Sequence, residues 1–159
     1  MNEDGKQIDQ CLGLLLLVGD AMQTFLPYRD FQKSASVIDN KRLWKQVLEA
    51  DGIIQIIVGR RKGYKNHPAV KMWEGYCDAL ICYRNECVRE WLKRRLHYGE
   101  RQFEFDTPYN TRLSKDPPWF GDERLHSSHR AALLKKNIEW YSRFGWKEEP
   151  VINYYWPVR

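Results

Sequence analysis

The sequence lacks the cysteine patterns that mark metal sites and redox enzymes. It has four cysteines, which form no CxxC pair and have no histidine partner at zinc-finger spacing: Cys11, Cys77, Cys82 and Cys87. We therefore expect neither a zinc knuckle nor a thioredoxin-like site. The last three follow one another at intervals of five residues inside a helical pattern. We interpret them as small buried hydrophobic residues in a reducing compartment.

The chain also lacks a hydrophobic run long enough to cross a membrane. The apolar stretch from Leu12 to Val18 is far shorter than the roughly 20 residues that a bilayer requires. Glu3 and Asp4 stand where a signal peptide would carry lysine or arginine. We therefore expect no membrane association and no secretion, and a location in the cytoplasm or, in a eukaryotic host, the nucleus.

No segment shows the period-two alternation of a β-strand, and no internal repeat or low-complexity tract is visible. Apolar residues recur instead at helical spacings, which predicts an all-α fold, a compact single-domain helical bundle. The expected helices are a short one after Asp30, one from about Asn40 to Val58 with Asp39 as its cap, one over residues 69–96, and one from Glu123 to Lys136.

The segments between these helices carry turn and loop signals. Two glycines, a proline and basic residues predict a loop from Gly59 to Pro68. Residues 97–122 are expected to be irregular, since Pro117 and Pro118 exclude a regular helix near their end. The C-terminal part is aromatic, with a short segment at residues 137–145 and a tail through Tyr154, Tyr155 and Trp156 that we expect to lie extended on the core.

A boundary in composition lies at Met22, where an apolar, acidic leader gives way to a segment that begins like a globular domain. We treat residues 1–21 as an N-terminal extension and residues 22–159 as the domain; the alternative is an extra helix packed on it. Of 26 basic and 21 acidic residues, 25 and 17 lie in residues 22–159, a net charge of +8. With 14% aromatic residues, this surplus favours a polyanionic partner, although charge alone fits a merely soluble basic surface equally well.

Three clusters mix cations with neutral hydrogen-bonding groups, as suits phosphate contact beside base or sugar contact. They are residues 41–49, residues 63–68 and residues 124–130. Lys65, Arg124 and Arg130 are candidate phosphate clamps, with surface salt bridges as an equally weighted alternative.

Histidines and aromatic residues each allow two interpretations. His67, His126 and His129 could form a metal site if they converged, but no nearby carboxylate completes a known ligand spacing. We therefore expect no metal, and ring nitrogens satisfied by backbone or phosphate. Four aromatic residues could stack on bases, but such a string is more often core, which we favour: Trp140, Tyr141, Phe144 and Trp146.

Several motifs in order resemble the pyrimidine-dimer DNA glycosylase family, to which the phage enzyme endonuclease V is related. The motifs are MQTFLPY at residues 22–28, GYKNHP at residues 63–68, PPWFGDERLHSSHR at residues 117–130, and the pattern from Trp140-Tyr141 to Phe144-Gly145. The likeness covers nearly all of residues 22–159.

The resemblance implies a compact, all-helical enzyme without metal or cofactor that acts on damaged double-stranded DNA. In that family the α-amine at the N-terminus attacks the sugar of a cyclobutane dimer, and the Schiff base then permits strand cleavage by β-elimination. An α-amine suits this task because its pKa lies near 8. Carried over to this sequence, the nucleophile is the amine of Met22 or, after trimming, of Gln23. Both exist only if residues 1–21 are absent.

The family's catalytic glutamate falls on Gln46 in our alignment, and an amide cannot take up a proton. Glu49, nearly one turn further on the same predicted helix face, is the available carboxylate, with Gln46 as its hydrogen-bonding partner. Arg42 and Lys45 would line the same groove.

We therefore expect a monomeric DNA repair glycosylase with AP-lyase activity on UV pyrimidine dimers or a related damaged base. The residues expected to hold phosphates or the opposite strand are Arg42, Lys45, Lys65, Asn66, His67, Arg124, His126, His129 and Arg130. The alternatives are a non-catalytic relative that binds damaged DNA and, ranked last, a nuclease that acts through His126 and His129.

Overall fold

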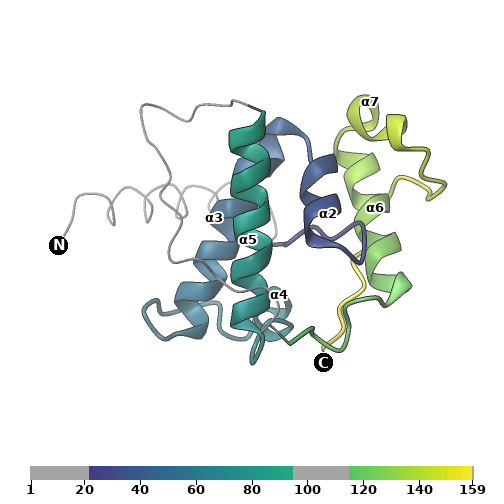
Figure 1. Cartoon of the computed structure of the whole chain (residues 1–159). Coiled ribbons are helices and arrows are strands. Elements are labelled where there is room, and N and C mark those ends of the chain that lie inside the picture. The colour runs from purple at the N-terminus through teal and green to yellow at the C-terminus, as the bar shows by residue number, and fades with distance from the viewer. Residues whose placement is uncertain (1–21, 95–114, 159) are drawn as a thin grey trace.

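The computed structural model describes residues 22–94 and 115–158, and in this part of the chain every regular element is a helix. The all-α prediction is therefore confirmed (Figure 1). The leader, Cys11 and the predicted irregular segment up to residue 114 lie outside the described residues. The elements are α2 (Phe31–Val37), α3 (Asn40–Ile57), α4 (Pro68–Lys71), α5 (Cys77–Lys93), α6 (Glu123–Lys136), α7 (Ile138–Tyr141) and the 3₁₀ helix η2 (Ser142–Phe144).

Aspartates define the starts of α2 and α3. The Asp30 side chain accepts a hydrogen bond from the Lys33 amide, and the Asp39 side chain accepts one from the Arg42 amide. Both satisfy amides that have no partner within their own helix. The prediction of a short helix followed by a long one capped by Asp39 is confirmed.

The single helix predicted over residues 69–96 is wrong within the described residues. The chain instead forms the short α4 and then α5, with a break at Gly75, whose φ of +80° lies in the left-handed region that favours glycine. The helical spacing of apolar residues continues across Gly75, so the spacing alone predicted one unbroken helix. On α5, Leu92 is 46% exposed and Tyr83 is fully buried.

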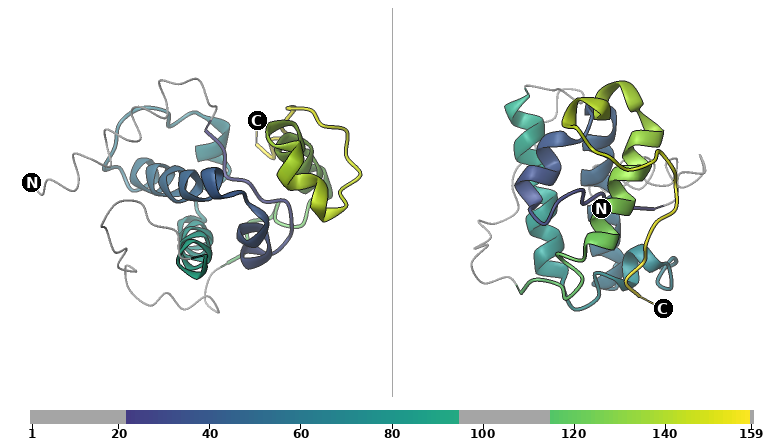
Figure 2. Two further views of the ribbon diagram at one scale, coloured as in Figure 1. Left: turned by 90° about the horizontal axis from the view of Figure 1, so that it is seen from above. Right: turned by 90° about the vertical axis from the view of Figure 1, so that its right-hand side faces the viewer.

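The core lies between the long helices and the C-terminal ones. Helices α3 and α5 pack against each other, α2 packs on α5, and α6 lies on the other side of the N-terminal segment (Figures 1 and 2). Cys82 and Cys87 are buried free thiols, as interpreted, whereas Cys77 is half-buried. Burial raises the pKa of the Cys87 thiol to about 12.

The C-terminal part of the chain closes the core. Asp122 caps α6, which spans Glu123–Lys136 as predicted. The tail after η2 has no regular structure, and its aromatic side chains pack against the core as expected: Tyr154, Tyr155 and Trp156. Among the described residues, no helix has the length and apolar character that crossing a membrane would require.

Candidate functional site

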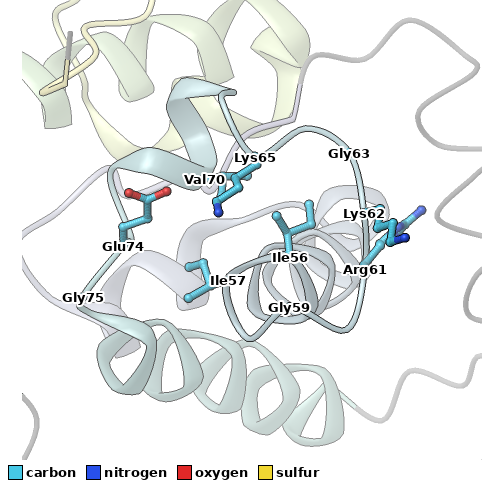
Figure 3. A pocket seen from close by; sticks show the side chains of 10 residues that line it. All are labelled: Ile56, Ile57, Gly59, Arg61, Lys62, Gly63, Lys65, Val70, Glu74 and Gly75. Carbon is cyan, nitrogen blue, oxygen red and sulfur yellow. The ribbon is translucent and has the colours of Figure 1, made fainter.

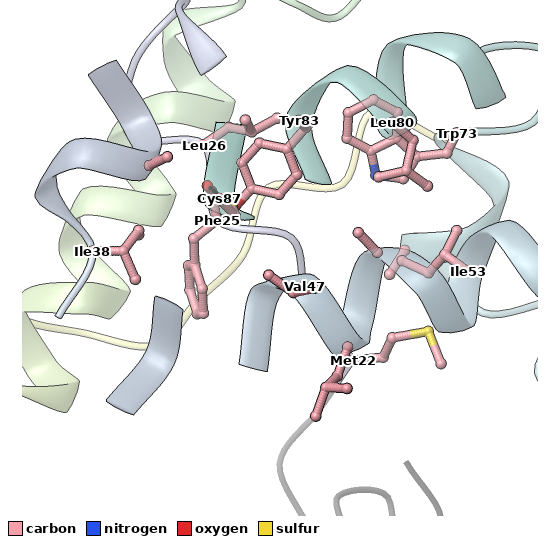
Figure 4. Packing of buried hydrophobic residues seen from close by; sticks show 14 of the residues in the cluster. Met22, Phe25, Leu26, Ile38, Val47, Ile53, Trp73, Leu80, Tyr83 and Cys87 are labelled. Atoms are coloured by element: carbon pink, nitrogen blue, oxygen red, sulfur yellow. Dashed lines mark hydrogen bonds between the residues drawn. The ribbon is translucent and has the colours of Figure 1, made fainter. Parts of the chain in front are cut away.

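The N-terminal segment, residues 22–28, is a non-helical strip of backbone that runs through the interior. It passes between α3 and α5 on one side and α6 on the other (Figure 2), and every side chain from Met22 to Pro27 is buried. Figure 4 shows Met22, Phe25 and Leu26 inserted into the packed interior. A buried backbone outside regular structure must find hydrogen-bond partners among side chains, since its amides and carbonyls have no ladder to join.

Gln46 on α3 supplies partners on one side of this segment. Its Oε1 accepts a hydrogen bond from the Phe25 amide at 2.7 Å, and its Nε2 donates one to the Gln23 carbonyl at 3.1 Å. The Tyr83 hydroxyl lies 2.6 Å from Gln46 Oε1 and 2.8 Å from the Phe25 carbonyl oxygen, so it can donate to either. Trp73 Nε1 donates to Thr24 Oγ1 at 3.0 Å. Gln46 therefore needs both its donor and its acceptor for this task.

Two histidines on α6 hold the other side. The Leu26 amide donates to His129 Nδ1 at 2.9 Å, and His126 Nδ1 lies 2.7 Å from the Leu26 carbonyl oxygen. The Gly121 amide donates to His126 Nε2 at 3.0 Å, so His126 carries its proton on Nδ1. His129 must carry its proton on Nε2, because its Nδ1 is an acceptor. The amide and the carbonyl of the buried Leu26 are thus each bonded by a neutral histidine ring, and the two rings carry their protons on opposite nitrogens.

The surroundings of both rings favour the neutral form. Desolvation by burial lowers the pKa of His129 to about 3, and the charge of a protonated His126 acts in the same direction. Burial also lowers the pKa of His126, against the opposing effect of its hydrogen bond to Leu26. At 1% and 0% exposure, His126 and His129 present no ring nitrogen to the surface. Backbone groups bond both nitrogens of His126 and Nδ1 of His129, whereas His129 Nε2 is buried without a hydrogen-bond partner among the described residues.

Glu49 is the carboxylate next to the start of the segment. It lies half-buried on α3, and its Oε2 accepts a hydrogen bond from the Gln23 amide at 3.2 Å. In a chain that began at Gln23, this same nitrogen would be the α-amine. Gln46 and Glu49 are three residues apart on one helix face, so Gln46 fixes the backbone whose nitrogen Glu49 meets. Met22, the residue before Gln23, is 4% exposed.

Two of the arginines predicted to bind nucleic acid are paired within the fold. Arg130 donates to the Pro27 carbonyl at 2.8 Å and to Glu148 at 2.7 Å, and it also pairs with Glu123. Arg42 donates to Asp39 at 2.9 Å. The salt-bridge alternative is therefore what the geometry shows for Arg130 and, at the surface, for Arg124, which pairs with Asp122.

The remaining basic and polar candidates lie at the surface. Arg124 is exposed, bonds Asp122 at 2.8 Å and lies over the Tyr155 ring at 4.6 Å. Its hydrogen bond lowers the pKa of the Asp122 carboxyl. Lys65 and Asn66 are exposed, and Lys45 is half-buried one turn before Glu49 on α3.

His67 has a structural partner. Its Nδ1 accepts a hydrogen bond from the Ala69 amide at 3.1 Å, which caps α4, and partial burial lowers its pKa. It lies far along the chain from the α6 histidines, and no group of three or more potential metal ligands occurs among the described residues.

The aromatic string near the C-terminus belongs to the core. Trp140 Nε1 donates to the Val37 carbonyl and Trp146 Nε1 donates to the Tyr28 hydroxyl, each at 2.8 Å. The buried Tyr141 hydroxyl donates to Asp39 Oδ2 at 2.8 Å. Trp140 and Tyr141 therefore hold α7 to the turn between α2 and α3, and Trp146 binds the end of the N-terminal segment, while Trp140, Phe144 and Trp146 pack half-buried against the core.

Sequence reasoning missed Tyr83 and Trp73 as partners of the N-terminal segment. Both lie in apolar stripes, where nothing in the pattern separates a hydrogen-bonding ring from an ordinary core residue. Gln46 did carry a signal, because an amide on the buried face of a long helix requires polar partners.

Comparison with known proteins gives one match. A model of the pyrimidine dimer DNA glycosylase family matches residues 22–103, just over half of the chain. The match includes the N-terminal segment, α3 and α5, and leaves out α6 with its histidines. No curated protein and no solved structure matches the chain.

Proposed function

This chain belongs to the pyrimidine dimer DNA glycosylase family, and from that premise we propose that it is a DNA repair glycosylase with AP-lyase activity on UV pyrimidine dimers or a related damaged base. The observation that carries the proposal is the contact of 3.2 Å between the backbone nitrogen of Gln23 and Glu49 Oε2. This contact places a carboxylate beside the nitrogen that could become an α-amine. The nitrogen belongs to the N-terminal segment, which side chains of α3 and α6 bond from opposite sides.

The proposed reaction uses the neutral amine of residue 22 or 23. The amine forms a bond to C1′ of the damaged nucleotide, the bond from C1′ to the base nitrogen breaks, and the base nitrogen takes a proton from water. Glu49 takes the proton that the attached amine loses and returns it to the ring oxygen O4′ as the sugar ring opens to the protonated Schiff base. Glu49, ionised again, then takes a proton from C2′ as the C3′–O bond breaks and the 3′ phosphate leaves, which cleaves the strand. One carboxylate close to the nitrogen thus serves each proton transfer at the amine and the sugar.

Gln46 is a positioning residue in this proposal rather than a defective acid. A glutamate there could accept hydrogen bonds from Phe25 but could not donate one to the Gln23 carbonyl, as Nε2 does at 3.1 Å. The carboxylate that contacts the Gln23 nitrogen belongs to Glu49. It lies three residues after Gln46, the position on which our alignment placed the family's glutamate. Gln46 therefore gives no reason to expect a loss of activity.

The DNA contacts we propose are those of side chains that reach the surface. They are Arg42, Lys45, Lys65, Asn66, His67 and Arg124. His126, His129 and Arg130 are not among these contacts. All three bind the backbone of the N-terminal segment and hold it in place. A nuclease acting through His126 and His129 has no support, because Leu26 occupies a nitrogen of each buried ring. The proposed partner is damaged duplex DNA bound by a monomer.

Borohydride trapping on a duplex with one cis-syn thymine dimer tests the proposal. We expect a covalent adduct from protein that begins at Met22 and none from the full 159-residue chain, in which residue 22 has no free amine. Peptide mapping of the adduct then tells Met22 from Gln23 as nucleophile. No adduct from either form, on this duplex or on an abasic control, would overturn the mechanism. Salt-dependent binding without an adduct would identify a non-catalytic relative that binds damaged DNA.

A further inference from the structure

Gln23 has one polar group that the fold leaves without a partner. Its backbone nitrogen donates to Glu49 Oε2 at 3.2 Å, its carbonyl accepts from Gln46 Nε2 at 3.1 Å, and its side-chain Oε1 accepts from the Thr24 amide at 3.0 Å. Its side-chain Nε2 has no hydrogen-bond partner among the described residues, although the side chain is only 2% exposed. A buried donor without an acceptor opposes folding, which favours a role in binding a ligand.

The Thr24 amide fixes the direction of this donor. An N–H group needs an acceptor, so the side-chain atom that faces the Thr24 amide is the oxygen, and Nε2 points away from that amide. Turning the side-chain amide over would only place two donors together. Gln23 therefore presents a fixed donor within the length of one side chain of the backbone nitrogen that contacts Glu49.

A group beside the attacking nitrogen can reach only a few atoms of the substrate, and this step rests on the proposed function. The amine must come within about 3–3.5 Å of C1′ in order to react. C1′ carries the base, and the O2 atom of a pyrimidine lies on the minor-groove edge, next to the bond from C1′ to the base nitrogen. In thymine, O2 is an acceptor that base pairing does not use. The free donor of Gln23 and this free acceptor are complementary.

We propose that Gln23 Nε2 donates a hydrogen bond to O2 of the damaged pyrimidine and is a catalytic residue for loss of the base. As the bond from C1′ to the base nitrogen breaks, its electron pair stays on the base and its charge spreads to O2. A hydrogen bond at O2 stabilises this charge until the base nitrogen takes its proton from water. Glu49 then moves the protons of the amine and the sugar, while Gln23 stabilises the leaving base.

Binding by the full 159-residue chain tests the contact without catalysis, since residue 22 has no free amine in that chain. The probes are a duplex with one cis-syn thymine dimer and a duplex with a tetrahydrofuran abasic site, which has no base and no O2. The measured quantity is the ratio of the two affinities. Gln23→Met, which is similar in size and lacks the donor, should lower this ratio roughly tenfold. An unchanged ratio would overturn the proposal.

A second variant guards against a change in the local backbone. Gln23→Glu keeps an oxygen that can accept from the Thr24 amide, but its carboxylate cannot donate to O2 and repels its charge. It should lower the ratio at least as much as Gln23→Met does. A ratio that fell in Gln23→Met but not in Gln23→Glu would show that the loss comes from the Thr24 contact, which would contradict the proposal.

Two exposed positions supply matched controls. Gln32→Met on α2 makes the same chemical change at the surface and should leave both affinities unchanged. Lys62→Gln removes a cation from the pocket at the C-terminal end of α3, where Figure 3 shows Lys62 beside Arg61. It should weaken both duplexes equally, because both contain the same phosphates. A lower ratio in Lys62→Gln would mean that the ratio does not isolate O2 and would remove this support.

Kinetics separate stabilisation of the leaving base from positioning of the amine. In protein begun at Met22, Gln23→Met should slow release of the base from the dimer by roughly 100-fold, whereas cleavage at an aldehydic abasic site, which has no base to lose, should slow by less than about threefold. Equal slowing of both reactions would make Gln23 a positioning residue and overturn the proposal. Borohydride trapping at an abasic site reports the amine chemistry without base loss. The proposed mechanism and the contact to O2 can therefore fail separately.

Discussion

The N-terminal segment and the loop of residues 59–67 use polar side chains in opposite ways. Around the segment, Gln46, Tyr83, His126 and His129 are buried and bond backbone groups of residues 23–26. Around the loop, Arg61, Lys62 and Lys65 make no ion pair within the described residues.

This contrast separates two tasks within one small domain. A buried side chain that bonds the backbone fixes a geometry, because the groups that it uses are not available to a ligand. A side chain that keeps its charge unpaired is available to a partner. Substitutions around the segment should therefore change catalysis or stability, and substitutions around the loop should change binding.

The largest effect, a loss of catalysis, is expected at Glu49, the proposed acid and base that contacts the Gln23 nitrogen of the segment. Glu49→Gln removes the proton acceptor but keeps an oxygen that can accept from the Gln23 amide, so the fold should be retained. We expect strand cleavage by protein begun at Met22 to slow by about 100-fold or more in single-turnover assays. Glu139→Gln, an exposed carboxylate on α7, is the control and should cleave at the parental rate. An unchanged rate in Glu49→Gln would remove Glu49 from the mechanism.

The next effect is a loss of stability from Gln46→Leu. The substitution leaves the Phe25 amide and the Gln23 carbonyl buried without their partner. Each unsatisfied group costs about 1–3 kcal/mol, so we expect the free energy of unfolding to fall by roughly 3 kcal/mol in urea titrations. Gln55→Leu on the same helix should change it by less than about 1 kcal/mol. Similar losses in the two variants would mean that the segment does not depend on the amide.

The histidine pair predicts a specific dependence of stability on pH. Because burial lowers the pKa of His129 to about 3 from an ordinary 6.5, protons bind more strongly to the unfolded chain. The free energy of unfolding is therefore fully retained above pH 6.5 and falls as the pH drops from there towards 3. The slope contributed by one histidine is about 1.4 kcal/mol per pH unit.

Urea titrations between pH 6.5 and 5 measure this slope before most carboxylates titrate. His129→Gln keeps an acceptor for the Leu26 amide but does not titrate, so its slope should be smaller than the parental one by about 1.4 kcal/mol per pH unit. Identical slopes in the two proteins would show that His129 is not held neutral by the fold.

The sequence predicted features that depend on neighbouring residues better than features that depend on distant ones. Local signals predicted the helices well, since Asp30, Asp39 and Asp122 occupy cap positions that depend only on neighbouring amides. Gly75 was missed because the apolar period runs through it, and only its backbone φ of +80° reveals the break.

The site was predictable only in part, because its contacts join distant segments. Gln46 was identified through the family resemblance, and Glu49 through its place on the same predicted helix face. The bonds from His126 and His129 to Leu26 span 100 and 103 residues, and no spacing rule connects such positions. The sequence therefore indicated surface contacts for histidines that lie in the core, where their partners are backbone groups with no residue-specific signature.

The smallest effect, a change in salt dependence, sharpens the contrast between the two regions. Lys65→Gln removes an exposed cation without an ion pair, so stability should change by less than about 0.5 kcal/mol. Binding to duplex DNA should lose about 0.9 from the slope of log affinity against log salt, the contribution of one phosphate contact.

Arg130→Gln is the matched comparison, since it removes a cation that bonds Pro27 and Glu148. It should lower the free energy of unfolding by about 2 kcal/mol and leave the salt slope unchanged, because its charge is already compensated inside the fold. Fluorescence anisotropy over a salt series, with urea titrations of the same proteins, measures both quantities. If Arg130→Gln reduced the salt slope as much as Lys65→Gln, paired and unpaired cations would contribute alike to DNA binding. The division between fixing and binding side chains would then not hold for this surface.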